Sequence, residues 1–382
     1  MPEAALKLRR ATVVELRGTE ASEQSVLARL DDGSARPAVV DVALLGPCEV
    51  GDELIVNVQA RDLGLGSGGF DIVHVNLTKG LAGEGTAGAH VMKLNYTSLQ
   101  HAVRPLEEEQ GEREGALHVQ APVGVLALHG QLAPLAWAFS QAVPQARLGF
   151  VQTPGGALCG GHSRLVRRLL DDGLLAGHIS AGAAFGGQRE AITTAGALHH
   201  GARELGWDAI VCGPGPGIVG SGSVLGHGGL HALDSAHTAL ALGAETLLVA
   251  RMSSADPRER HRGASHHTLT VLELLLRPVT VALPAGMFSL AELGLRDVES
   301  TPSEHESVRR ASQIADGLRR HDWRMVEVDT TGFQASGLPA RTMGRTVDED
   351  PLFFASPLAA GTVLADMCRR RAKREDRARL TT

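Results

Sequence analysis

Short apolar runs alternate with turn residues over positions 9–78. The runs are ATVVEL, SVLARL, AVVDVALL, ELIVNV and FDIVHVNL, and turns such as Asp32-Gly33 and Gly51-Asp52 separate them. Strands of this length and spacing are typical of a small closed sheet. We therefore predict a small antiparallel, barrel-like β domain over residues 1–80.

The pattern changes near residue 117, where apolar segments alternate with segments of helical periodicity. The candidate strands are VGVLAL, ARLGFVQ, GHISAG, AIVCG, ETLLVA and PVTVAL, and WRMVEVD could add another. Strands that are apolar at nearly every position indicate a sheet covered on both faces. Alternation with helices, such as the stripe Leu165, Val166, Leu169 and Leu170, indicates parallel strands. We predict an α/β domain over residues 117–368, with a doubly wound, mostly parallel sheet.

Two polar segments flank this domain. We predict a linker or a surface hairpin over residues 81–116. This segment contains Gly83, Gly85, Gly88 and the polar run EEEQGEREG. Residues 369–382 form a basic C-terminal tail, which we interpret as a charged helix end or a frayed terminus, with RNA contact as the alternative. Residues 303–321 have the pattern of a helix.

Composition narrows the class of protein. The chain has 382 residues and 43% apolar residues, which fits two or three globular domains. The net charge of −6 argues against a general nucleic-acid binder. The first residues lack the apolar core and cleavage site of a signal peptide, and no apolar run approaches the ~20 residues of a membrane span. The four cysteines form no C-x-x-C pair, so we expect a cytoplasmic protein without membrane association.

Glycine, histidine and arginine gather in the segments that follow the predicted strands. Parallel sheets bind ligands beyond the carboxyl ends of their strands, where backbone N–H groups and helix N-termini point outward. In GPGPGIVGSGSVLGHGG, the residues Gly215, Gly217, Gly220 and Gly222 would let backbone amides approach an anion. Close backbone packing is the alternative reason for these glycines.

The segment ADPRERHRGASHHTLT has the strongest chemical signal. Arg258, Arg260 and Arg262 supply forked donors, and Ser265 is placed to cap the helix that follows. His266 and His267 would lie in the first helical turn, where the helix dipole favours neutral imidazole. We predict an anion site with His266 or His267 as acid or base. The alternative is a solvated loop in which the arginines pair with its own Asp256 and Glu259.

Other motifs give less specific signals. Residues 215–220 match G-x-G-x-x-G, but no helix opens within the motif, and Arg251 rather than an acidic residue ends the next strand. Arg251 could hold a 2′-phosphate, yet the sequence also lacks G-K-[ST], so the cofactor stays unknown.

Metal binding and covalent catalysis are further candidate functions. His227, His231 and Asp234 are weak metal-ligand candidates, for which ordinary helix-start residues are the simpler interpretation. Cys159, near His162, is a weak candidate nucleophile. Glu190 is a candidate general acid, or a carboxylate that stabilises a helix N-terminus.

Three motifs, GHISAGAAFGGQREA, GPGPGIVGSGSVLGHGG and RMSSADPRERHRGASHHTLT, resemble a bacterial protein family described only as a domain of unknown function. The resemblance covers most of the chain and implies no activity, cofactor or catalytic residue. Members of that family lack a cysteine at the turn that holds Cys159 here, which counts against Cys159 as a nucleophile.

Together these patterns predict an enzyme, a transferase or a hydrolase, that binds an anionic small molecule, phosphorylated or nucleotide-like. The alternative is a regulatory or RNA-associated protein that uses the N-terminal barrel and the basic tail. The barrel could also only cover the α/β domain or mediate self-association. The substrate, strand order and oligomeric state are not encoded in patterns of this kind.

Overall fold

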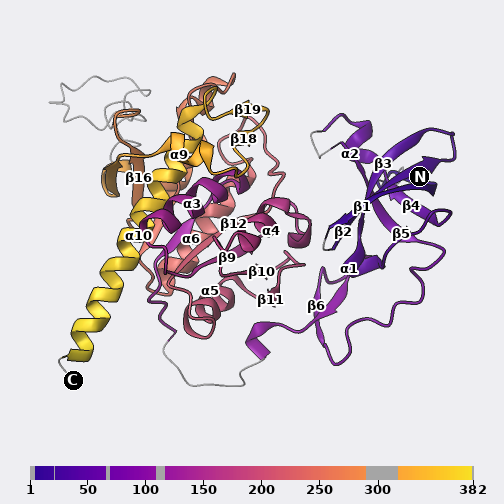
Figure 1. Cartoon of the computed structure of the whole chain (residues 1–382), viewed down its shortest axis with the longest axis horizontal. Coiled ribbons are helices and arrows are strands. Elements are labelled where there is room, and N and C mark those ends of the chain that lie inside the picture. The colour runs from indigo at the N-terminus through magenta and orange to yellow at the C-terminus, as the bar shows by residue number, and fades with distance from the viewer. Residues whose placement is uncertain (1–4, 21, 66–68, 109–116, 290–316, 381–382) are drawn as a thin grey trace. The chain divides into compact units, whose positions relative to one another are not determined.

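The computed structural model describes residues 5–20, 22–65, 69–108, 117–289 and 317–380 (Figure 1). The chain divides into two compact units, Met1–Arg104 and Pro105–Thr382. This division falls inside the segment 81–116 that we predicted as a linker or hairpin. The run EEEQGEREG lies mostly outside the described residues, as does the predicted helix up to residue 316.

The first unit is a small β domain with two short helices. Its elements are β1 (Leu8–Glu20), β2 (Glu23–Leu30), β3 (Ala35–Asp41), α1 (Val42–Leu45), β4 (Glu53–Asn57), α2 (Gln59–Asp62), β5 (Asp71–Asn76), β6 (Val91–Lys93) and β7 (His101–Val103). Strands β1 to β5 form a closed barrel in the order β1-β2-β3-β5-β4, which confirms the predicted barrel. The pairings are antiparallel except for β3 with β5, which run parallel.

The second unit has a parallel sheet at its centre. Its strands are β8 (Val123–Val125), β9 (Leu148–Thr153), β10 (Gly177–Ala181), β11 (Arg189–Ala191), β12 (Ala209–Pro214), β13 (Thr246–Leu248), β16 (Thr280–Pro284) and β17 (Asp322–Val326). Its helices are α3 (Leu132–Ala142), α4 (Arg164–Asp171), α5 (Thr194–Arg203), α6 (His231–Ala241), α7 (His266–Leu274), α9 (Thr330–Ala335) and α10 (Pro351–Leu380). Two small ladders pair β14 (Met252–Ser253) with β15 (Gly263–Ala264) and β18 (Arg341–Thr342) with β19 (Arg345–Thr346).

Hydrophobic cores cover both faces of this sheet. One core contains Leu198 of α5, Ala236 of α6 and Leu272 of α7. The other contains Leu135 of α3 and Leu364 of α10, the helix drawn in yellow in Figure 1. Burial on both faces explains why the strands are apolar at nearly every position, and it confirms the predicted α/β class.

The strand order places a reversal in the middle of the sheet. The order is β11-β10-β9-β12-β8-β13-β16-β17, so the chain starts at β8, builds outward to β11, returns at β12 and then continues past β8 to β17. Open α/β sheets bind ligands beyond the carboxyl ends of the strands at such a reversal. The loops after β8, β12 and β13 are therefore the expected place for a ligand.

Helix α10 is long, and its first part is apolar. The part Pro351–Arg377 would be long enough to cross a membrane by length and composition, but 83% of its most apolar stretch is buried inside the protein. A core helix passes the same test, and the packing of α10 against α3 and the sheet has that character.

Candidate functional site

A cavity of ≈ 510 Å³ lies beyond the carboxyl ends of the parallel strands, the edge of the sheet where we expect a ligand. Its walls come from the loops after β8, β12 and β13, together with the hairpin β18–β19 and the start of α10. We call it the arginine cavity; its lining residues are Leu128, His129, Gly130, Gly215, Pro216, Gly217, Ile218, Val219, Gly220, Ser221, Arg251, Arg258, Arg260, His261, His267, Arg341, Thr342, Met343 and Phe353.

The glycine loop is packed so closely that side chains would not fit at one of its key positions. A Cβ atom on Gly215 would lie 2.3 Å from the carbonyl oxygen of Ala157 and 2.8 Å from Nε2 of Gln152. Gly217 has a φ of +77°, a conformation that favours glycine. Gly215, Gly217 and Gly220 line the arginine cavity, whereas Gly222 is exposed and lies outside its lining. Close packing therefore explains Gly215, and the loop still brings its backbone to the cavity.

The arginines surround one buried carboxylate. Asp256 is fully buried and accepts hydrogen bonds from Nε and Nη2 of Arg258 at 2.9 and 2.8 Å. Arg251 and Arg345 lie 3.6 and 3.9 Å from the same carboxylate. The hydrogen bonds from Arg258 hold the pKa of Asp256 far below its usual range, so it stays ionised.

The remaining arginines of this loop differ in their contacts. Arg260 lines the arginine cavity and, among the described residues, forms no hydrogen bond or ion pair. Arg262 instead donates from Nε to the backbone carbonyl of Asp256 and lies outside the cavity lining. Arg251 and Arg260 therefore present positive charge to the cavity beyond what Asp256 neutralises.

Ser265 caps α7 and organises the histidines beside it. Its Oγ accepts a hydrogen bond from the backbone N–H of His267 and lies 2.7 Å from Nδ1 of His261. Nη1 of Arg251 lies 2.8 Å from Nδ1 of His267. Because a guanidinium only donates, Nδ1 of His267 accepts, and the neutral ring carries its proton on Nε2.

The rings of four histidines from three segments of the chain lie close together. They are His227, His261, His266 and His267, which we call the imidazole cluster. The rings of His227 and His267 stack with centroids 3.7 Å apart, and His266 lies 4.4 Å from His267. Burial lowers the pKa of His261 to about 3 and that of His267 to about 2, with Arg251 adding to both effects. Burial likewise lowers the pKa of His227 and of His266. These imidazoles are therefore neutral at ordinary pH.

The other residues singled out from the sequence lie elsewhere. His231 and Asp234 form an exposed pair, with Nδ1 and Oδ2 3.6 Å apart, and are not members of the cluster that contains His227. Glu190 lies in β11, where its Oε1 accepts from the backbone N–H of Gly186. Neither Glu190 nor Cys159 lines the arginine cavity. Their proposed chemical roles stay predictions.

The structure also shows a histidine and serine pair that the sequence analysis missed. Nδ1 of His129 lies 3.2 Å from the carbonyl oxygen of Pro214, and its Nε2 lies 2.8 Å from Oγ of Ser163. A carbonyl only accepts, so Nδ1 carries the proton and Nε2 accepts from the serine hydroxyl. Burial lowers the pKa of His129 to about 4. Ser163 also caps α4 and is 3% exposed, so its hydroxyl is not presented to the arginine cavity. The only sequence signal was the position of His129 directly after a strand.

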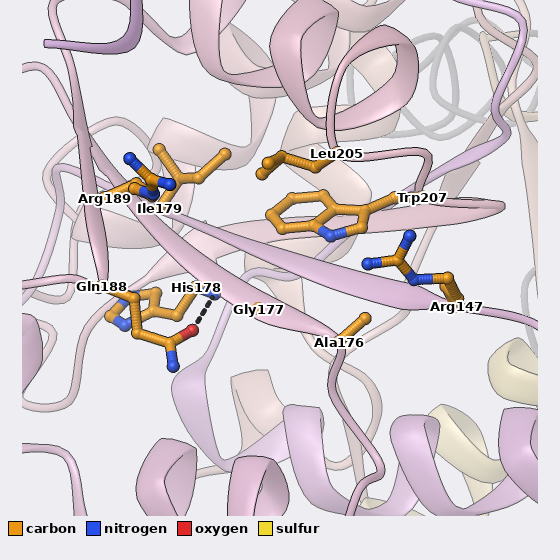
Figure 2. A pocket seen from close by; sticks show the side chains of 9 residues that line it. All are labelled: Arg147, Ala176, Gly177, His178, Ile179, Gln188, Arg189, Leu205 and Trp207. Carbon is orange, nitrogen blue, oxygen red and sulfur yellow. Dashed lines mark hydrogen bonds between the residues drawn. The ribbon is translucent and has the colours of Figure 1, made fainter.

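A second cavity, of ≈ 240 Å³, lies at the opposite edge of the sheet (Figure 2). Its lining includes Arg147, Gly177 and Trp207, which precede or open β9, β10 and β12. A Cβ atom on Gly149 would lie 1.8 Å from the indole of Trp207, so the ring fills space left by glycine. A position at the amino ends of the strands, beside a structural tryptophan, makes this cavity the weaker candidate.

Comparison with known proteins identifies the family. No curated protein and no solved structure matches the chain. The model of a family described as "Protein of unknown function (DUF3866)" matches residues 38–361, which include every residue that lines the arginine cavity. The chain therefore belongs to this family of unknown function, as the three sequence motifs had indicated.

Proposed function

We propose that this protein is an enzyme that binds an anionic small molecule, phosphorylated or nucleotide-like, in the arginine cavity. One observation carries the proposal: Arg258 and Arg260, the glycine loop 215–220 and His267 line the same cavity at the strand-order reversal. These groups come from two segments, the loop after β12 and the segment after β13 that leads into α7. Guanidinium groups bind phosphate oxygens through paired hydrogen bonds, so this lining favours an anion.

The charge balance supports an anionic ligand. Among the described residues, Asp256 and Asp350 are the buried carboxylates in contact with the arginines. Asp350 accepts from Nε of Arg345 at 3.0 Å. Arg251, Arg258, Arg260 and Arg345 outnumber these two carboxylates. The two carboxylates therefore leave part of the positive charge of the arginines uncompensated. A bound phosphoryl group would supply the missing negative charge.

The imidazole cluster supplies the chemistry in this proposal. His267 faces the arginine cavity and, in the neutral form with its proton on Nε2, is a hydrogen-bond donor to negative charge that develops in a transition state. His266 stands next to it and is the second candidate for acid–base work. The reaction class is group transfer or hydrolysis, and the compartment we propose is the cytoplasm.

A thermal-shift panel of phosphorylated metabolites and nucleotides tests the proposal. A ligand present at about 100-fold above its Kd stabilises the folded state by about 2.7 kcal/mol. Replacing Arg260 with alanine should abolish the shift, because its guanidinium has no other partner among the described residues. Arg168→Ala is the matched control, since this exposed arginine of α4 pairs with Asp172 outside the cavity. A shift that survives Arg260→Ala unchanged would remove this arginine from the site.

A further inference from the structure

His227, His266 and His267 meet in a way that ordinary packing does not explain. One ring nitrogen from each lies within 4.8 Å of the others. His227 is 6% exposed, and neither of its ring nitrogens has a hydrogen-bond partner of normal geometry, although the carbonyl of Val224 is near enough to offset part of the burial effect on its pKa. Nε2 of His266 is also buried without a partner.

Unpartnered imidazole nitrogens in the interior are costly, because each has lost its hydrogen bonds to water. Two neighbouring rings with this defect indicate a group that accepts their lone pairs. Gly229 lies next to two of these rings. A Cβ atom at this position would lie 3.0 Å from Nδ1 of His227 and 3.2 Å from Nδ1 of His267. A glycine thus keeps the space beside both rings clear.

We propose that His227, His266 and His267 bind one divalent transition-metal ion of the zinc class beside the arginine cavity. Neutral imidazole is a preferred ligand of Zn²⁺, Co²⁺, Ni²⁺ and Cu²⁺. Three protein ligands leave a coordination position for water or for an oxygen of the ligand, as in catalytic zinc sites. His267 lines the cavity, so that position is next to the proposed anion site.

Metal binding requires Arg251 to release His267. It also requires the stacked rings of His227 and His267 to rotate, because an imidazole binds a metal in the plane of its ring and these two planes are nearly parallel. If the metal binds Nδ1, it takes the lone pair that Arg251 now uses; if it binds Nε2, the proton moves to Nδ1, which can no longer accept. Arg251 lines the arginine cavity, so a released guanidinium could bind an anion there. The anion would also reduce the repulsion between the metal and the neighbouring arginines. Metal and anion should therefore bind cooperatively, a step that rests on the proposed function, whereas metal binding itself does not.

Titration of the full chain with Co²⁺, after removal of metals by a chelator, tests the site. We expect one ion per chain and the visible ligand-field band of a four-coordinate Co²⁺ ion with nitrogen ligands. His227→Ala should weaken binding by more than about tenfold, since even the loss of a residue that only hydrogen-bonds to a metal ligand costs about 10–100-fold. His231→Ala is the matched control: this exposed histidine is four residues away and outside the cluster, so its variant should bind Co²⁺ like the unchanged protein. Sulfate, added as a simple anion, should tighten Co²⁺ binding in the unchanged protein and much less in Arg251→Met.

The outcomes separate the two proposals. Absence of stoichiometric Co²⁺ binding to the unchanged protein overturns the metal site, whatever the variants do. Equal loss in His231→Ala and His227→Ala also overturns it, and His266→Gln repeats the test if His227→Ala fails to fold. An anion-induced thermal shift that persists in the presence of chelator, together with no Co²⁺ binding, would leave the proposed function standing without the metal. Co²⁺ binding that sulfate does not change would overturn only the cooperative step.

Discussion

The buried carboxylate of Asp256 determines how the arginines of the cavity are placed. It is fully buried and is shared by Arg251, Arg258 and Arg345. From the sequence, pairing of Asp256 with the loop arginines was the alternative to an anion site. The structure shows this pairing for Arg258, which also lines the arginine cavity together with Arg260, an arginine without a hydrogen bond or ion pair among the described residues. The anion site itself stays a proposal.

Replacing Asp256 with asparagine should therefore destabilise the protein strongly. The change leaves the buried guanidinium of Arg251 without its nearest opposite charge, and loss of one partner of a buried pair costs about 3 kcal/mol or more. Denaturant unfolding followed by circular dichroism measures the effect. Asp172→Asn, which breaks the exposed pair with Arg168, should cost less than about 1 kcal/mol. Equal effects of the two changes would show that Asp256 does not hold the arginines in place.

His178 and His129 make stability depend on pH on the acid side. Burial lowers the pKa of His178 to about 3, with a smaller contribution from His129, and burial lowers the pKa of His129 to about 4. The unfolded chain binds these protons near pH 6.5, whereas the folded protein does not. Their contribution to stability is thus complete above pH 6.5 and is lost as the pH falls from about 6.5 towards 4 for His129 and towards 3 for His178.

Replacing His178 with phenylalanine should make the acid side of the stability profile less steep. Each proton bound only by the unfolded chain costs about 1.4 kcal/mol per pH unit, so the slope between pH 6 and about 4 should decrease by up to that amount. The ring of His178 stacks on Phe150, which favours an aromatic replacement. The free energy of unfolding at pH 7.5 serves as the reference, because both histidines are neutral there. An unchanged slope would mean that His178 does not titrate on unfolding.

At the scale of elements, the sequence indicated the strands better than their arrangement. The apolar segments at β8, β9, β10, β12, β13 and β16 follow from burial on both faces of the sheet. The extra strand β17 was also predicted, although it lies at the edge of the sheet and is partly exposed. The strand order does not follow, because apolar strands carry no information about their neighbours. The parallel pairing of β3 with β5 and the hairpin β18–β19, which brings Arg341 and Met343 to the cavity, had no local signal either.

The same limit explains what the sequence showed of the site. The loops after the strands were recognisable because parallel strands bring their carboxyl ends to one edge, so Arg258, Arg260 and the glycines could be assigned to a common region. The contact of His227 with His266 and His267 depends on how the 3₁₀ turn Gly228–Leu230 packs against α7. Helical spacing instead favoured His231 and Asp234 as partners of His227, because tertiary contacts leave no trace in local periodicity.

At the scale of the whole molecule, the basic tail is tied to the α/β unit. Nη2 of Arg370 lies 2.6 Å from Oε1 of Glu245, and Arg371 pairs with Asp208 at 3.5 Å and with Glu375 at 3.0 Å. These contacts are those expected of a charged helix end. Contact of the tail with RNA remains the alternative prediction, and salt-sensitive RNA retention that disappears on deletion of residues 369–382 would support it.

Each unit has a core of its own, and this predicts that the second unit folds and binds its ligand without the first. The buried apolar residues of the barrel form one cluster that contains no described residue beyond Val73, whereas the two cores of the α/β unit begin at Leu106 and Leu126. All residues of the arginine cavity lie in the second unit. A protein of residues 105–382 should therefore unfold cooperatively and keep the anion-induced thermal shift, with the same loss on Arg260→Ala. A fragment that folds but no longer responds to the anion would show instead that the barrel takes part in the site.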